Sequence, residues 1–104
     1  MSKRIALTDG SGKWFSQETA ERFEETSEHD GRNWISNATG SQFEHENLYR
    51  TKGGKFILNH WSQWQGTREY YEEISNEAAA VWFSKNGLDP HEACEKEFNE
   101  LEIQ

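Results

Sequence analysis

"HENLYRTKGGKFILNHWSQW", residues 45–64, is the stretch that decides the fold. Two runs rich in aromatic and aliphatic side chains, 45–51 and 55–64, flank the short loop "KGG" at 52–54. Such runs favour β-strands, and glycine supplies the positive backbone angles that tight hairpin loops require. The stretch therefore predicts an antiparallel β-hairpin, in which a three-residue loop places Leu48 opposite Leu58 and Glu46 opposite His60.

Both faces of this hairpin are partly apolar, because side chains alternate between faces along a strand. One face is predicted to carry Leu48, Phe56, Leu58 and Trp64 with Glu46, Arg50 and His60, and the other Phe43, Tyr49, Ile57 and Trp61 with His45 and Gln63. Three short helices can hardly cover two faces in so small a chain. We therefore expect Trp64 in the core and the three aromatic rings of the second face at or near the surface. The alternative is that residues 26–42 or a second copy of the chain covers that face.

Turn residues, helix caps and periodicity predict the elements around the hairpin. Strands are expected at Arg4–Thr8, around Asn33–Asn37 and at Glu69–Ile74, and helices at Gln17–Glu25, at Asn76–Asn86 and from Pro90 to about Glu102. The predicted caps of the three helices are Ser16, Ser75 and Asp89. The fold class is α+β: a mostly antiparallel sheet of four to five strands, a short helix after the first hairpin, and two C-terminal helices packed on the sheet.

The predicted helices have recognisable inner sides. Ala20 and Phe23 share the buried side of the first helix, and Ala79, Trp82 and Phe83 share one face of the second. In the last helix Cys94, Phe98 and Leu101 have the spacing of a core-facing stripe.

Length and composition predict a single globular domain over residues 1–104. Only 33% of the residues are hydrophobic and 29% are charged, which approaches the composition of disordered chains. Five Trp, three Tyr and six Phe argue against disorder, since each buried ring removes ~150–250 Å² from water. The core is therefore expected to be largely aromatic.

The single cysteine, Cys94, excludes an internal disulfide and is typical of a reducing compartment. No apolar run approaches the ~18 residues that a membrane-spanning helix needs. The sequence thus predicts a cytoplasmic protein.

The formal net charge of −8 disfavours direct binding to nucleic acid or to anionic membranes. Arg50, Lys52 and Lys55 form only a small positive patch near one hairpin end, and the glycine turns at 9–12 and 39–41 are a weak signal for anion binding. Residues 88–104 are strongly acidic, with Asp89, Glu92, Glu95, Glu97, Glu100 and Glu102 against Lys96. Such a run is usually a solvated helix face, and the alternative is a surface that docks on a basic partner.

The polar residues give no strong catalytic motif. His29, His45, His60 and His91 lack the close ligand spacing of known metal motifs, so no metal site or cofactor is predicted. Glu46 beside His60, with Arg50 along the same face, is the best candidate for general-base chemistry. A cross-strand ion pair is the favoured interpretation of these residues.

Four segments carry a resemblance: "LTDGSGKWF" (7–15), "ISNATGSQFEHENLYRTKGGKFIL" (35–58), "SQWQG" (62–66) and "EEISNEAAAVWF" (72–83). With them the chain resembles an uncharacterised family of small bacterial and phage-borne proteins. The resemblance implies a bacterial or mobile-element accessory protein, and it assigns no activity to any residue.

The leading functional hypothesis is a non-enzymatic, acidic protein-binding module that modulates a larger partner, as anti-CRISPR, anti-restriction or antitoxin proteins do. The residues predicted to bind the partner are Phe43, Tyr49, Trp61, Gln63, Glu92, Glu95 and Glu102. The partner would be a protein with a basic, nucleic-acid-binding surface, and a homodimer through the aromatic face is an alternative. The second hypothesis is a small hydrolase or metal-assisted enzyme that uses Glu46, His60 and His45. A third is a small-molecule sensor whose ligand stacks on Trp61.

Overall fold

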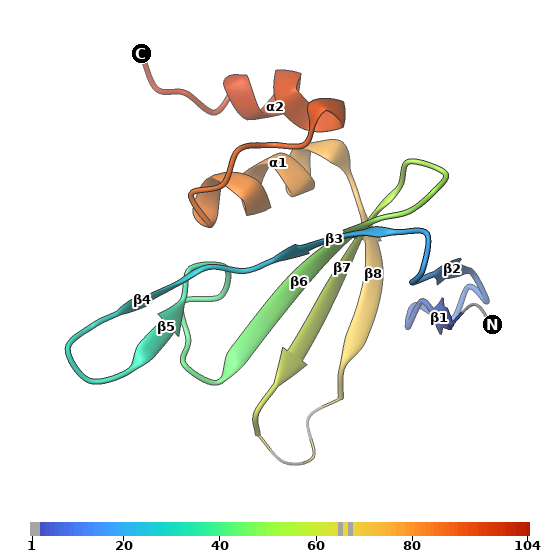
Figure 1. Ribbon diagram of the computed structural model, residues 1–104, viewed down its shortest axis with the longest axis horizontal. Helices are drawn as coiled ribbons and strands as arrows, with labels where there is room; N and C mark the ends of the chain where they lie inside the picture. The colour runs from blue at the N-terminus through green and yellow to red at the C-terminus, as the bar shows by residue number, and fades with distance from the viewer. Residues whose placement is uncertain (1–2, 65, 67) are drawn as a thin grey trace.

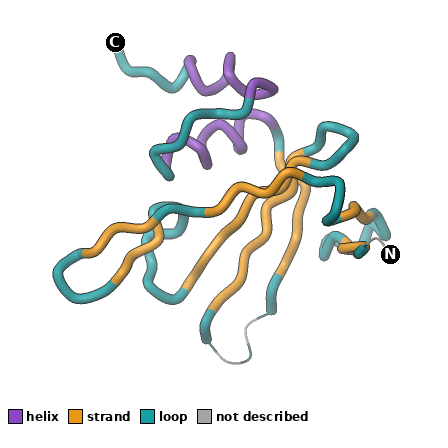
Figure 2. Tube along the Cα trace, viewed as in Figure 1, coloured by secondary structure: helices purple, strands orange, loops and turns teal. Residues whose placement is uncertain are grey.

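A four-stranded antiparallel sheet with the strand order β3-β6-β7-β8 forms the centre of the molecule, as the computed structural model in Figure 1 shows. The structure describes residues 3–64, 66 and 68–104. The elements are β1 (Arg4–Ala6), β2 (Trp14–Ser16), β3 (Glu21–Glu24), β4 (Ser27–His29), β5 (Trp34–Ser36), β6 (Glu44–Arg50), β7 (Phe56–Ser62), β8 (Tyr70–Ile74), α1 (Asn76–Lys85), the 3-10 turn η1 (Glu92–Cys94) and α2 (Glu95–Asn99). Two further two-stranded pairs, β1-β2 and β4-β5, flank the sheet (Figure 2). The α+β class is confirmed.

The register of the central hairpin is confirmed. Leu48 pairs with Leu58 and Glu46 with His60, so the loop has the predicted length. Of the two loop glycines, only Gly54 has a positive φ, at 87°. One left-handed residue is therefore enough to close this turn.

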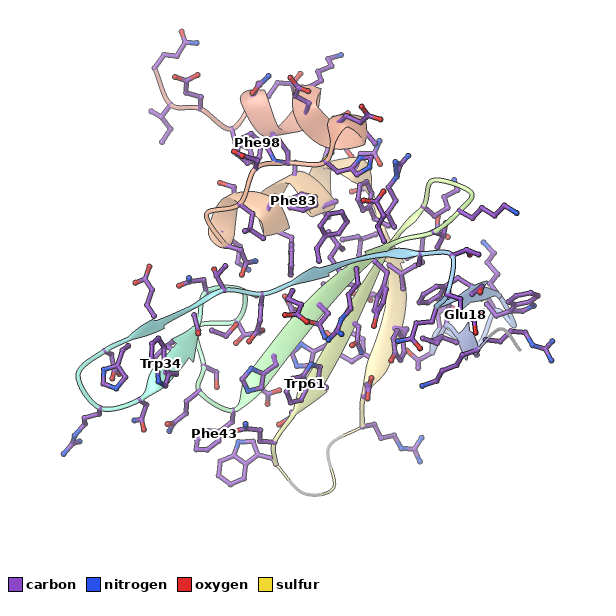
Figure 3. All side chains as sticks on the ribbon, viewed as in Figure 1. Glu18, Trp34, Phe43, Trp61, Phe83 and Phe98 are labelled. Atoms are coloured by element: carbon purple, nitrogen blue, oxygen red, sulfur yellow. The ribbon has the colours of Figure 1, made fainter. Side chains whose placement is uncertain are left out.

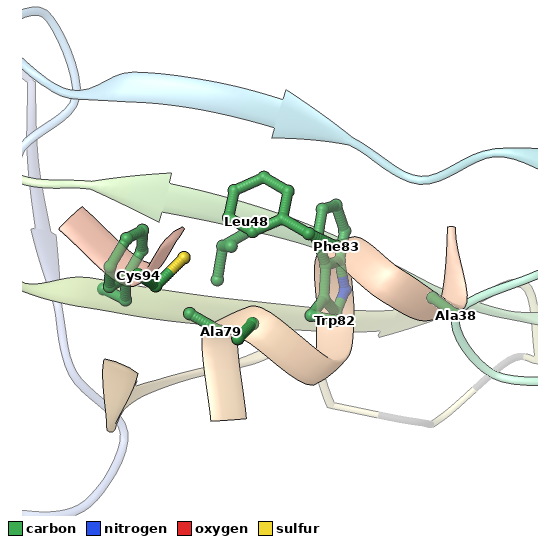
Figure 4. Packing of buried hydrophobic residues seen from close by; sticks show 8 residues of the cluster. Ala38, Leu48, Ala79, Trp82, Phe83 and Cys94 are labelled. Atoms are coloured by element: carbon green, nitrogen blue, oxygen red, sulfur yellow. The ribbon is translucent and has the colours of Figure 1, made fainter. Parts of the chain in front are cut away.

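One face of the sheet packs against α1 to form the larger core, which we call the helix-side core (Figure 4). Leu48 and Phe56 from the sheet are almost fully buried, as are Phe83 from α1 and Cys94 from η1. Ser75 caps α1 as predicted, since its side chain accepts a hydrogen bond from the backbone N–H of Ala78.

The opposite face of the sheet carries a second, smaller core, which we call the hairpin-side core. Tyr49 and Ile57 point to this side and are covered by the β1-β2 hairpin, which contributes Ile5, Leu7 and Phe15. Phe15 packs 5.4 Å from Tyr49, measured between ring centroids. Both faces of β6 and β7 are therefore covered where they lie between α1 and the hairpin.

The helix predicted at Gln17–Glu25 is wrong, because β3 occupies Glu21–Glu24 and pairs with β6. Phe23 lies opposite Leu48 and packs against the helix-side core, whereas Ala20 packs against the hairpin-side core. The two side chains serve opposite faces, as in an extended chain and not in a helix. Pairing along a free sheet edge here outweighs the helix-forming tendency of a polar segment.

The last helix is shorter than predicted, and its cap differs. It begins with η1, whose N-cap is His91: the Nδ1 atom accepts a hydrogen bond from the backbone N–H of Ala93. Cys94 is fully buried and Phe98 packs against the core, but the predicted core position Leu101 is 43% exposed because α2 ends at Asn99. The short α2 packs on α1 and η1 more than on the sheet.

The segment at 27–36 forms a hairpin of which only the second strand was predicted. Strand β4 pairs with β5 through a turn in which Asp30 Oδ1 accepts hydrogen bonds from the backbone N–H groups of Arg32 and Asn33. These bonds lower the pKa of Asp30. None of the described helices is long and apolar enough to cross a membrane.

Candidate functional site

Aromatic side chains lie at the end of the central sheet farthest from the helices, where β6 begins and β7 ends (Figures 1 and 3). The rings of Phe43 and Trp64 contact each other at a centroid distance of 4.5 Å. Trp64 is 57% exposed, so its predicted core position is wrong. We call Phe43, Trp61 and Trp64 the aromatic end.

Tyr49 does not belong to this exposed cluster. It is only 4% exposed because the β1-β2 hairpin covers it. The predicted surface position of Tyr49 is therefore wrong, while Phe43 and Trp61 are half-buried and Gln63 is exposed.

Trp61 is held in place by a chain of contacts that begins at Glu25. The ring of Trp61 stacks on His45 at 4.4 Å, and His45 Nδ1 lies 2.7 Å from Glu25 Oε2. The other oxygen of Glu25 accepts hydrogen bonds from the backbone N–H of Glu46 and the hydroxyl of Ser36. Glu25 thus continues the pairing of β6 where β3 stops, and through His45 it anchors Trp61 to the sheet edge.

His60 lies on the opposite face, between two carboxylates. Its Nδ1 is 3.3 Å from Glu46 Oε2, and its Nε2 is 2.9 Å from Glu44 Oε2. The imidazole also stacks on Tyr70, with a centroid distance of 4.9 Å and an interplanar angle of 6°. Burial, followed by the negative charges of Glu72, Glu46 and Glu44, raises the pKa of Tyr70.

The predicted catalytic set is only partly brought together. Glu46 and His60 are adjacent, but His45 lies on the other face with Trp61, and Arg50 turns to His91, with its Nη1 3.1 Å from Nε2 of that ring. In the described part of the chain, no three His, Cys, Asp or Glu side chains converge in a way that could hold a metal ion.

The acidic C-terminal residues lie away from the aromatic end. Glu92, Glu95 and Glu102 are exposed on or after η1 and α2, and Figure 3 shows Phe98 of α2 at the opposite end of the molecule from Phe43. The seven residues predicted to bind a partner therefore do not form one continuous surface.

Sequence reasoning missed two exposed tryptophans and one anchoring carboxylate. Trp14 is 57% exposed and Trp34 is 64% exposed, each in a short strand of a flanking hairpin. The sequence does carry a signal for the exposure of Trp14, because this residue closely follows the glycine turn at 9–12. Glu25 had no signal, because its role depends on where β3 leaves the sheet.

Comparisons with known proteins give no relative: no family model matches the chain, and no match is found among curated proteins or solved structures. The site must therefore be interpreted from its own geometry.

Proposed function

We propose that the chain is a non-enzymatic protein-binding module whose contact surface is the aromatic end. The observation that carries this proposal is the Phe43–Trp64 pair, which leaves most of a tryptophan in solvent beyond both cores. Burying such a ring removes a large apolar area from water, and tryptophan is enriched at binding hot spots. Because Glu25, His45 and Trp61 fix the neighbouring surface, little conformational entropy is lost on binding.

The arrangement of the histidines supports binding over catalysis. Both ring nitrogens of His60 face carboxylate oxygens, so neither is free to take a proton from a substrate. The alternative function, a small hydrolase built on Glu46 and His60, rests on their 3.3 Å contact. This function requires that a substrate displace Glu44 from His60 Nε2. It would be favoured if the native chain hydrolysed generic ester substrates, if His60→Gln abolished that hydrolysis, and if His91→Gln retained it.

Charge complementarity indicates a basic partner. The net charge of −8 attracts a positively charged surface and speeds encounter, an effect that salt weakens. An inhibitor that covers a nucleic-acid-binding groove, such as an anti-CRISPR, anti-restriction or antitoxin protein, is the concrete form of this function. In such a complex, exposed glutamates would take the place of phosphates.

The test is affinity capture from nuclease-treated bacterial lysate with two single variants. Trp64→Ala removes the proposed contact, whereas Trp34→Ala removes a comparably exposed ring elsewhere. A stoichiometric protein that binds the native chain and Trp34→Ala but not Trp64→Ala supports the proposal. Equal capture by both variants, or loss of binding in Trp34→Ala alone, contradicts it.

The electrostatic part has a separate test on the captured partner. Glu95→Lys with Glu102→Lys changes the charge by +4 far from the aromatic end. If long-range attraction guides the encounter, this variant and added salt both slow association while dissociation stays the same. If neither the charge reversal nor added salt changes the association rate, long-range attraction plays no part in binding, and only the aromatic contact of the proposal remains.

A further inference from the structure

A cleft of about 930 Å³ lies between the β1-β2 hairpin and the loop that joins β6 to β7. It lies at the opposite end of β6 and β7 from the aromatic end, and nothing in the proposed function uses it. Its lining differs in charge from the rest of this acidic chain. Four cationic side chains, Arg4, Lys13, Lys52 and Lys55, surround it, and among the described lining residues Glu73 is the one acid.

The cationic groups of the cleft keep their capacity to bind an anion. Glu73 lies 3.9 Å from Lys13 Nζ and 4.0 Å from Lys55 Nζ, which is beyond hydrogen-bond distance. Both lysine side chains are more than two-thirds exposed. Glu73 therefore draws the two ammonium groups together without occupying their N–H donors.

Below this charged rim the cleft is apolar. Leu7, Phe15 and Ile57, which belong to the hairpin-side core, form its base, and each is less than a tenth exposed. The Trp14 ring, which also lines the cleft and is 57% exposed, supplies most of the apolar surface of this floor that a ligand can reach. A ligand that fits both parts carries negative charges and at least one aliphatic side chain. A peptide segment rich in glutamate or aspartate, with a leucine or isoleucine among them, has this chemistry.

Nucleic acid fits the cleft less well. A single strand needs an aromatic face on which its bases stack, and the guanidinium of Arg4 lies over the Trp14 ring at 5.4 Å from the centroid. One face of the available ring is thus already engaged. A long polyanion also meets the repulsion of the whole chain, whereas a short acidic segment meets mainly the local charges.

From these observations we infer that the cleft is a second docking site, which binds an acidic peptide segment of a partner protein through Lys13, Lys55 and the apolar floor. It is independent of the aromatic end. A partner that presents basic and acidic surfaces together would contact both sites.

The test follows the amide and indole NMR signals of the full chain during titration with the blocked peptide EELEIEEL at low salt. The expected result is shifts at Lys13, Lys55 and the Trp14 indole, with weaker binding as salt rises. The neutral peptide QQLQIQQL should bind at least about tenfold more weakly, because the charge pairs are lost. Equal binding of the two peptides, or shifts centred on Trp64, would overturn the inference.

Matched variants separate local from overall charge. Lys13→Glu with Lys55→Glu should weaken binding of EELEIEEL about tenfold or more. Lys85→Glu with Lys96→Glu makes the same change in net charge on the helices and should leave the affinity within about twofold. If the introduced glutamates disturb folding beside Glu73, Lys13→Gln with Lys55→Gln replaces that variant, and it should also weaken binding of EELEIEEL. Equal losses in the cleft and helix variants would overturn the site.

Two further measurements test the identity of the occupant. A short oligothymidylate that binds more tightly than EELEIEEL would show that the cleft prefers nucleic acid, which contradicts the inference. Sedimentation that reveals a dimer of the native chain, abolished by the Lys13 and Lys55 variants, would show that the occupant is a second copy. Failure of Trp64→Ala to change partner capture bears on the aromatic end and leaves this test unaffected.

Discussion

Phe83 is the residue that joins the helix-side core together. Its ring meets Phe23 of β3 edge-on at 5.0 Å and Phe56 of β7 at 6.4 Å, so it connects α1 with an edge strand and a central strand. The neighbouring Val81 lies on the outer side of the same helix and is 42% exposed.

Phe83→Ala is therefore expected to lower the free energy of unfolding by about 3–5 kcal/mol, because it leaves a cavity among rings that cannot close it. Val81→Ala, on the same helix, should lower it by only about 0.5 kcal/mol or less. Urea unfolding followed by circular dichroism measures both. Similar losses in the two variants would mean that α1 does not pack as described.

Cys94 shows how burial controls reactivity at a single atom. The residue is fully buried, and burial raises the pKa of its thiol, so the reactive thiolate is suppressed. We expect the native chain to resist a disulfide reagent such as DTNB at pH 8 and to react rapidly once unfolded in urea. Rapid reaction of the native chain, with Cys94→Ala as the blank, would contradict this packing.

At the scale of single elements, the sequence predicts best where local chemistry decides. The central hairpin, its register, the Ser75 cap and the strand near 34–36 follow from turns, caps and alternation, and all are confirmed. Strand β3 could not be predicted in this way, because Phe23 is placed by its partner Leu48, 25 positions later. The prediction for the aromatic end failed for the same reason: Tyr49 is buried because the β1-β2 hairpin docks on it, and Trp64 is exposed because it lies beyond the end of β7 at Ser62.

The loop between β6 and β7 permits a sharp test of backbone conformation. Gly54→Ala should destabilise the chain by about 1–2 kcal/mol, since Gly54 has φ 87° and an added Cβ would lie 3.1 Å from Arg50 Nη2. Gly53→Ala, whose Cβ would meet nothing closer than 3.9 Å, is the matched control and should cost at most about 0.5 kcal/mol. Thermal unfolding of the pair compares them, and equal midpoints would refute the assigned turn.

At the scale of the whole molecule, two tyrosines make stability depend on alkaline pH. Burial comes first among the causes that raise the pKa of Tyr71, followed by its hydrogen bond to Glu69, and burial also leads for Tyr70. In the unfolded chain both titrate near the ordinary value of about 10. The unfolded state therefore loses its protons first, and the stabilisation present below pH ~10 is lost as the pH rises toward the folded pKa values.

We accordingly expect the free energy of unfolding to fall above pH ~10, and to fall less steeply in Tyr71→Phe. Urea titrations at successive pH values give the free energies, and absorbance near 295 nm reports ionisation of the tyrosines. If both tyrosines of the folded chain ionise at the ordinary value, the raised pKa values are refuted.

The division of the interior into two cores on opposite faces of one sheet has a consequence for hydrogen exchange. Strands β1 and β2 are three residues each and meet the sheet through the smaller cluster, so the hairpin can open while the sheet and α1 stay intact. Amide protons of Ile5 and Phe15 should then exchange with a lower opening free energy than those of Leu48 and Tyr49. Because the basic cleft exists only while the hairpin is closed, a bound acidic peptide would slow exchange in the hairpin before anywhere else.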